Sequence, residues 1–144
     1  MYENPVSNEA IRFPKTEEYL KSEFVELSNN YRKGGHTASC TLVAFDVAGI
    51  VLEEGGHPSI LSIVGQKVDS INTKTIVPKC FEGRITWGAH QVCENEGIVY
   101  DPMVGKPLPL ETYLQTVFTE PVEAEVRFST EQIKESNLRM ESLK

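Results

Sequence analysis

Cysteine is scarce in this sequence, and the count is odd. Three cysteines in 144 residues do not form the dense, paired framework of a small secreted domain, so we expect no disulfides and a reducing compartment. No apolar run approaches the roughly 18 residues of a transmembrane helix, and Met1–Pro14 lacks the apolar region of a signal peptide. We therefore expect a cytoplasmic protein, or one delivered into a target cell by a specialised secretion route, and no membrane partner.

Basic residues are also few. Lysine and arginine number 14 against 21 acidic residues, which gives a net charge of −7 and a pI near 5.0. The basic residues are scattered, so the chain is not expected to bind nucleic acid or an anionic membrane. A zinc site from His36, His57, His90 and a cysteine is conceivable, but these residues lack the spacing of metal ligands, and we expect no metal.

The chain is long enough to bury one core, with 40% hydrophobic residues. We expect a partly ordered lead-in over residues 1–15 and a single domain over residues 16–144. Thr16 is the expected N-cap of a first helix, which ends at Asn29-Asn30 or by Gly34-Gly35. The most apolar segment of the chain follows this helix.

That segment, residues 41–52, predicts a second helix between an N-cap at Ser39 and a stop at Gly55-Gly56. It is apolar on nearly every side, which predicts a helix buried at the centre of the fold. The other expected elements are strands over 59–64 and 121–128, two strands carrying His90 and Asp101, a short helix over 110–118, and a C-terminal helix opened by a capping box over 129–132. A leading helical part followed by strands predicts an α+β fold with a mainly antiparallel sheet.

Cys40 starts the second helix, an environment that favours a thiolate. The unpaired N–H groups and the positive dipole end of the first turn stabilise negative charge, whereas a free cysteine is only a few per cent ionised at neutral pH. An imidazolium beside the sulfur would favour the thiolate further and then protonate a leaving amine. The alternative is that Cys40 is a small buried residue of a core helix.

His90 and Asp101 lie on two short strands joined by a turn at Gly97, which suits a left-handed conformation. A loop of two residues (96–97) or four (94–97) would put both side chains on one face of the hairpin, whereas a three-residue loop would separate them. On one face, Asp101 would accept a hydrogen bond from His90 and fix its tautomer. The alternatives are a histidine bonded to backbone and a turn-initiating aspartate.

The remaining candidates are weaker. Cys93 lies at an odd offset from His90, so it faces the other side of the strand and is expected in the core. Cys80, in a loop without apolar pattern, is the second choice for a nucleophile. Trp87 is expected to be a core or pocket-rim aromatic.

These residues resemble the small papain-fold toxin domains at the ends of bacterial polymorphic toxins and in related effectors. The likeness covers the chain from about Phe24 to Phe118. It rests on short matches: Ser39-Cys40-Thr41-Leu42-Val43-Ala44, Gly55-Gly56, Gly88-Ala89-His90, Val99-Tyr100-Asp101-Pro102 and the segment Pro107 to Leu114.

The resemblance implies a papain-like core, in which a buried helix carrying the cysteine packs on a small sheet carrying the histidine and the aspartate. It implies that Cys40 is the nucleophile, His90 the base and Asp101 the orienting acid, with no cofactor. The implied activity is that of a peptidase, a glutamine deamidase or a transglutaminase-like acyl transferase on a protein or peptide substrate. A cognate inhibitor or immunity protein is the expected partner.

One departure from the family concerns the oxyanion hole. Papain-type enzymes usually place a glutamine shortly before the cysteine, and no glutamine precedes Cys40 in this chain. Either Asn29 or Asn30 takes the role of this glutamine, or the backbone N–H of Cys40 carries it. The candidates for the oxyanion hole or the substrate cleft are Ser39, Asn30, Trp87 and Gly88. The missing glutamine keeps an alternative open, in which the domain is an inactive papain-like module that binds protein.

Overall fold

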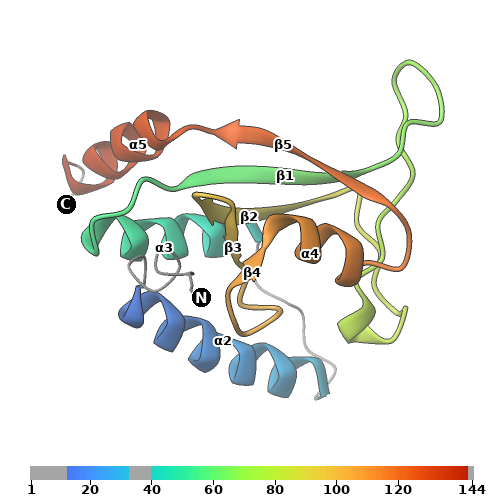
Figure 1. The fold of residues 1–144 in the computed structure, drawn as a ribbon, viewed down its shortest axis with the longest axis horizontal. Helices are drawn as coiled ribbons and strands as arrows, with labels where there is room; N and C mark the ends of the chain where they lie inside the picture. The colour runs from blue at the N-terminus through green and yellow to red at the C-terminus, as the bar shows by residue number, and fades with distance from the viewer. Residues whose placement is uncertain (1–12, 33–39, 143–144) are drawn as a thin grey trace, which may run out of the picture.

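The computed structural model describes residues 13–32 and 40–142, apart from the side chains of residues 30–32 and 138–142. Within this part, the helices are α2 (Pro14–Arg32), α3 (Cys40–Glu53), α4 (Leu110–Thr116) and α5 (Thr130–Ser142), with a short 3₁₀ helix, η1 (Lys79–Phe81). The strands are β1 (Ser59–Gly65), β2 (Ala89–Asn95), β3 (Ile98–Tyr100), β4 (Leu108–Pro109) and β5 (Val122–Phe128). They form one antiparallel sheet in the order β4-β3-β2-β1-β5, which confirms the α+β class (Figure 1).

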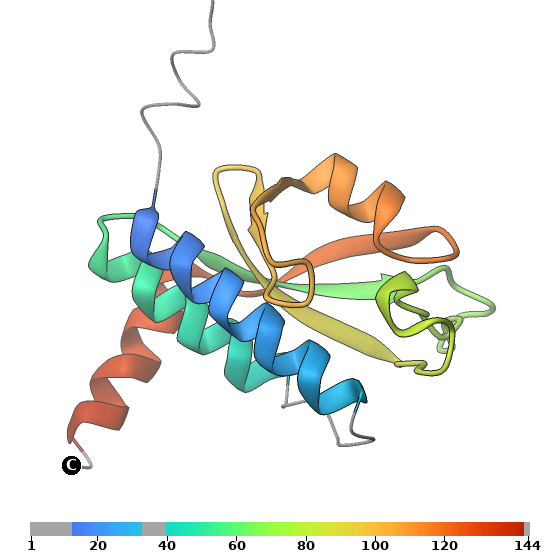
Figure 2. The same cartoon turned by 90° about the horizontal axis from the view of Figure 1, so that it is seen from below.

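The sheet has a hydrophobic cluster on each face, because successive strand residues point to opposite sides. One cluster joins Ile60, Cys93 and Tyr100 of the sheet to buried residues of α2, α3 and α5. The other joins Leu61, Val92 and Val99, their neighbours along the same strands, to the buried side chains of η1, α4 and the loops beside them. Figures 1 and 2 show α2 running alongside α3. None of the helices in the described ranges is long and apolar enough to cross a membrane.

Helix α2 begins at Pro14, and the prediction that Thr16 is its N-cap is wrong. Thr16 lies inside the first turn, where its backbone N–H and its hydroxyl both donate to Glu54 Oε1, each at 2.9 Å. The backbone N–H of Lys15 donates to the other oxygen of the same carboxylate at 3.1 Å. A side chain from the end of α3 therefore caps α2, a contact that no local pattern indicates.

Helix α3 ends as predicted, but it is not buried on every side. Gly55 has a φ of 92° and the N–H of Gly56 donates to the Val51 carbonyl at 2.9 Å, a left-handed stop. The buried residues Ala44, Val47, Ala48 and Val51 form one stripe, whereas Leu42 is 67% exposed. The sheet and α2 therefore cover only part of the helix surface.

The hairpin of β2 and β3 has the two-residue loop, Glu96-Gly97, with φ values of 51° and 84°. This is the geometry of a tight turn that matches the twist of the strands. Strand β3 pairs with Cys93 to Asn95, in the second half of β2. The first half of β2, which carries His90, therefore extends beyond the end of β3.

The C-terminal helix α5 starts with the predicted capping box. The backbone N–H of Ser129 donates to Gln132 Oε1 at 2.8 Å, and the N–H of Gln132 donates to Ser129 Oγ at 3.2 Å. Ile133 is fully buried in the cluster shared with α2 and α3. The helix is therefore docked on the core through this residue.

Candidate active site

Cys40 is the first residue of α3, and its side chain is half-buried at the edge of a cavity. The cavity has a volume of about 270 Å³ and is also lined by His90 and Asp101. At this position the sulfur lies at the end of the helix where backbone N–H groups have no partner within the helix. The fold therefore gives Cys40 both solvent access and the positive end of a helix dipole.

His90 and Asp101 lie side by side, as the two-residue turn requires. With that turn they are diagonal neighbours on the same face of the hairpin. His90 Nε2 lies 3.0 Å from Asp101 Oδ2, and the two residues are only 5% and 4% exposed. A buried contact of this length fixes the ring, with Nε2 donating to the carboxylate.

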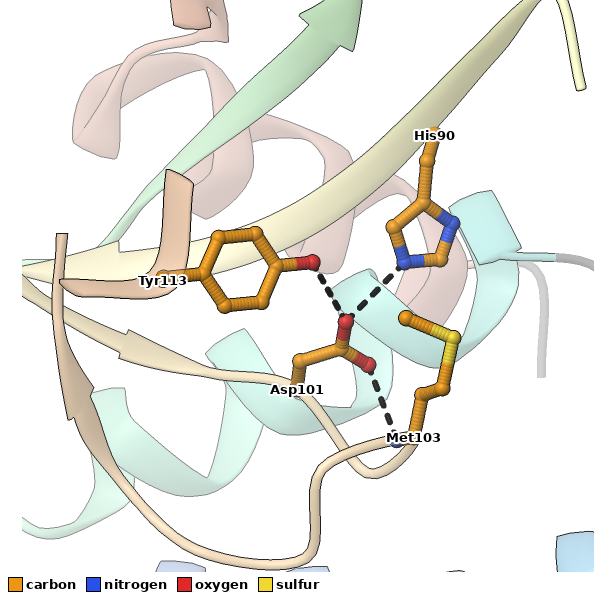
Figure 3. Close-up of polar contacts among 4 residues, drawn as sticks. All are labelled: His90, Asp101, Met103 and Tyr113. Atoms are coloured by element: carbon orange, nitrogen blue, oxygen red, sulfur yellow. Dashed lines mark hydrogen bonds and ion pairs between the residues drawn. The ribbon is translucent and has the colours of Figure 1, made fainter. Parts of the chain in front are cut away.

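The carboxylate of Asp101 is held by two further donors (Figure 3). The backbone N–H of Met103 donates to Oδ1 at 2.9 Å, and the hydroxyl of Tyr113 donates to Oδ2 at 2.6 Å. Tyr113, which belongs to α4, is fully buried. No sequence motif predicts a role for Tyr113, and the only signal for it is that a buried tyrosine hydroxyl needs a partner.

The second ring nitrogen of His90, Nδ1, is the atom that can reach the thiol. It is buried, and among the described residues no partner meets the distance and angle of a hydrogen bond to it. His90 is nevertheless the main cause of a lowered pKa at Cys40, and it outweighs the effect of partial burial. Contacts between a nucleophile and its base are often loose until substrate binds. The ring thus connects the sulfur on one side with the carboxylate on the other.

A backbone group that no sequence motif indicates also faces the sulfur. After the contact with His90 and the opposing effect of burial, the N–H of Gln91 is the next influence on the Cys40 pKa, and it lowers it. Gln91 lies in the half of β2 that extends beyond β3. The start of α3 therefore brings the sulfur to a strand edge that β3 leaves open.

Charge in this buried site is balanced between the ring and the carboxylate. Burial alone would lower the pKa of His90, but the Asp101 carboxylate outweighs it and, with Cys40, raises the pKa to about 9. Burial would likewise raise the pKa of Asp101, and the His90 ring, Tyr113 and the Met103 N–H hold it below its ordinary value. The arrangement favours a thiolate, an imidazolium and a carboxylate in a row.

Trp87 lies where a cleft residue is expected, against the histidine. Its ring stacks on His90 with centroids 4.6 Å apart and an angle of 8° between the planes, and Phe118 meets the imidazole edge-on at 6.3 Å. The indole shields the Asp101–His90 hydrogen bond from water, and its face attracts the protonated ring. Trp87 is half-buried and lines the cavity.

Of the other predicted cleft residues, only Gly88 is fully described, and the structure does not bring it to the site. Gly88 is exposed directly before β2 and is not among the described residues that line the cavity. Ser39 lies outside the described residues, and so does the side chain of Asn30. The roles of Ser39 and Asn30 stay predictions.

The other two cysteines have less acidic thiols. Cys93 is fully buried on the opposite face of β2, as predicted, and burial raises its pKa. Cys80 in η1 is more exposed, yet desolvation of its sulfur and the charge of Asp101 raise its pKa to about 11. Within the described part of the chain, no group of three or more His, Cys, Asp or Glu side chains is placed to hold a metal ion.

Comparisons with known proteins give no independent indication of family or function. No protein-family model matches the chain, and neither a curated protein nor a solved structure matches it. The fold and the geometry of the site are therefore the basis for any functional conclusion.

Proposed function

We propose that this protein is a papain-like cysteine hydrolase or acyl transferase that acts on an amide of a protein or peptide. The observation that carries the proposal is the position of His90, which binds the buried carboxylate of Asp101 at 3.0 Å and lowers the pKa of Cys40 at the start of α3. An ionised thiol, a charged imidazole and an orienting carboxylate are the groups that thiol attack on an amide requires.

The proposed reaction proceeds in two stages. The Cys40 thiolate attacks the carbonyl carbon of the amide, and the carbonyl electron pair moves to oxygen, where the N–H groups at the start of α3 stabilise the negative charge. The carbonyl re-forms, the carbon–nitrogen bond breaks, and the proton of His90 goes to the leaving amine, so a thioester remains on Cys40. Neutral His90 then takes a proton from water or from an acceptor amine, which attacks the thioester and releases the thiol.

The walls of the cavity indicate the kind of group that binds beside the sulfur. Apart from the polar groups of the site, most of the lining is apolar and includes Leu27, Val43, Phe81 and Met103. A charged side chain would lose its hydration there without gaining a partner of opposite charge. We therefore expect the substrate to present an uncharged group next to the reacting amide, and a glutamine side chain or an apolar peptide segment meets this condition.

The decisive experiment compares two cysteine variants. Wild-type protein, Cys40→Ala and the matched control Cys80→Ala are incubated with a candidate target proteome, and the products are identified by mass spectrometry. We expect wild type and Cys80→Ala to give the same products and Cys40→Ala to give none. Products that persist with Cys40→Ala would contradict the proposal.

The products of the same experiment also distinguish the three possible reactions that pass through the thioester. Peptide fragments identify a peptidase, conversion of glutamine to glutamate identifies a deamidase, and a covalent adduct identifies acyl transfer. The resemblance to toxin domains supports a bacterial toxin or effector as the biological setting. Toxicity that depends on Cys40 and is relieved by a co-expressed inhibitor would agree with that setting.

A further inference from the structure

One oxygen atom of the buried carboxylate receives two hydrogen bonds. Asp101 Oδ2 lies 3.0 Å from His90 Nε2 and 2.6 Å from the hydroxyl of Tyr113, while Oδ1 is occupied by the Met103 N–H at 2.9 Å (Figure 3). All three residues are at most 5% exposed. Water therefore cannot replace either donor without opening the structure, and the two donors must share one oxygen.

The Tyr113 hydroxyl acts as a permanent neutral donor. Burial and the charge of Asp101 raise its pKa well above the ordinary value for tyrosine, so it keeps its proton wherever His90 titrates. The ionisable groups that influence it are Asp101, Cys80 from η1 and Cys40 from α3. Those that face His90 are Asp101 and Cys40.

Sharing an oxygen has a direct effect on the histidine. A donor to a carboxylate stabilises the anion and lowers its affinity for protons. The part of the Oδ2 charge that the hydroxyl neutralises no longer attracts the proton on His90 Nε2. The hydroxyl also limits rotation of the carboxylate, because two donors from different elements fix the direction of its lone pairs.

We propose that Tyr113 is a positioning residue of the site, whose hydroxyl holds the Asp101 carboxylate in place and limits how strongly it retains the proton of His90. The role rests on the proposed function in one respect: His90 has to give up a proton to the leaving amine. An acid works best when its proton is not held too tightly at the working pH. With Asp101 alone, the ring would be a poorer acid.

The test follows the titration of His90 directly and needs no substrate. The variant is Tyr113→Phe, and the matched control is Tyr19→Phe, which removes a partly buried tyrosine hydroxyl from α2. Imidazole nitrogen and carbon-bound proton shifts are recorded by NMR across the titration. We expect the His90 pKa to rise by about half a unit to one unit in Tyr113→Phe, since the lost hydrogen bond to the charged carboxylate leaves more of its charge to attract the proton on the ring. Tyr19→Phe should titrate like wild type.

A second substitution at position 113 keeps the hydroxyl, so that the His90 pKa can be measured even if Tyr113→Phe does not fold. Replacing Tyr113 alone by 3-fluorotyrosine makes the phenol a stronger donor, and the His90 pKa should then fall. An unchanged or lowered pKa in Tyr113→Phe, or an unchanged or raised pKa with the fluorinated residue, overturns the inference. A purely structural role predicts lower stability with no change in the titration.

The proposed function is tested separately from this inference. If Cys40→Ala retains activity while the His90 pKa shifts as expected, the enzyme proposal fails and the role of Tyr113 as a neighbour of Asp101 stands. If Cys40→Ala is inactive and neither change at position 113 moves the titration, the enzyme proposal stands and the inference fails.

Discussion

Cys40 differs from the other two cysteines through its neighbours. The His90 ring and the N–H of Gln91 lower its pKa, while burial raises the pKa of Cys93, and that of Cys80 to about 11. Reaction with a small electrophile follows the thiolate fraction and the access to the sulfur. The relative alkylation rates of the three cysteines can therefore be predicted without knowing the substrate.

Iodoacetamide should label Cys40 first at mildly acid to neutral pH. Its rate should rise at lower pH than that of a free thiol, whose pKa is about 8.5, because the lowered pKa supplies thiolate where Cys80 and Cys93 have almost none. Peptide mass spectrometry after timed quenching measures the three rates in one sample. In His90→Gln the rate at Cys40 should fall at the same pH, because the main cause of the lowered pKa is removed. Equal labelling of Cys40 and Cys80 in wild type would contradict the assigned role of His90.

Because Trp87 stacks on His90, its fluorescence should report whether the imidazole is protonated. The chain contains one tryptophan, and its ring lies 4.6 Å from the imidazole. A protonated imidazole quenches an adjacent indole more strongly than a neutral one, so tryptophan fluorescence should increase as pH rises through about 9, the pKa of His90. The transition should be absent in His90→Gln, and it should be retained in Cys93→Ala. A flat profile in wild type would show that the ring does not titrate there.

The helices and strands determine where the side chains of Cys40, His90 and Asp101 meet. The two-residue turn sets the parity that brings Asp101 to His90, and the shortness of β3 leaves the edge of β2 to which α3 brings Cys40. Helix α2 supplies Leu27 to the cavity wall. Its own start is capped by Glu54 from the end of α3, which ties the two helices together.

Loss of this cap should destabilise the protein. Glu54→Gln removes a charged acceptor from the first turn of α2, and we expect the free energy of unfolding to fall by about 1 kcal/mol at neutral pH, as for the loss of other N-caps. Urea unfolding followed by circular dichroism measures the change. The matched control is Glu53→Gln, an exposed neighbour, which should behave like wild type.

The pH dependence of this effect has a definite sign. Partial burial would raise the pKa of Glu54, but the N–H groups of Lys15 and Thr16 and the Thr16 hydroxyl lower it. A group with a lowered pKa stabilises the fold above its unfolded pKa and loses that contribution as pH falls through the folded value. The difference between wild type and Glu54→Gln should therefore disappear in acid. A difference that persists there would argue against a charged cap.

For the whole molecule, the charged pair of His90 and Asp101 is buried in a sheet with hydrophobic clusters on both faces. The His90 pKa is raised from 6.5 to about 9 in the folded protein. Its contribution to stability is therefore complete below the unfolded value and is lost as pH rises through about 9. Asp101, whose pKa is lowered, contributes in the opposite sense and loses its effect in acid.

Stability should decline on the alkaline side as His90 loses its proton. Urea unfolding of wild type should show the free energy of unfolding falling by on the order of 2 kcal/mol between neutral pH and about pH 9. His90→Gln is expected to be less stable at neutral pH, because Asp101 loses its partner, and to lack this decline. Parallel pH profiles for the two proteins would exclude His90 as the source.

Much of the fold could be predicted from local pattern. The turn residues at Gly55-Gly56, the strand segment at 121–128 and the capping box at 129–132 are short-range signals, and the structure confirms each as an element. The predicted alternation of the strand does not continue to its end, because its register with β1 shifts between Val126 and Phe128 and Val126 is 66% exposed. The start of α2 and the exposure of Leu42 could not be predicted in this way. The first depends on Glu54, and the second depends on how much of α3 the sheet and α2 cover.

The sequence by itself determined which residue types were available for thiol chemistry and that Cys40 starts a helix, because helix signals are local. It left the turn of the hairpin open between lengths that join and lengths that separate His90 and Asp101. Tertiary structure decided this parity, placed Tyr113 and Trp87 on the pair, and brought the sulfur to the free edge of β2. The reason is physical: hydrogen bonds and stacking between residues far apart in the chain depend on how the elements pack, and no local pattern specifies that distance.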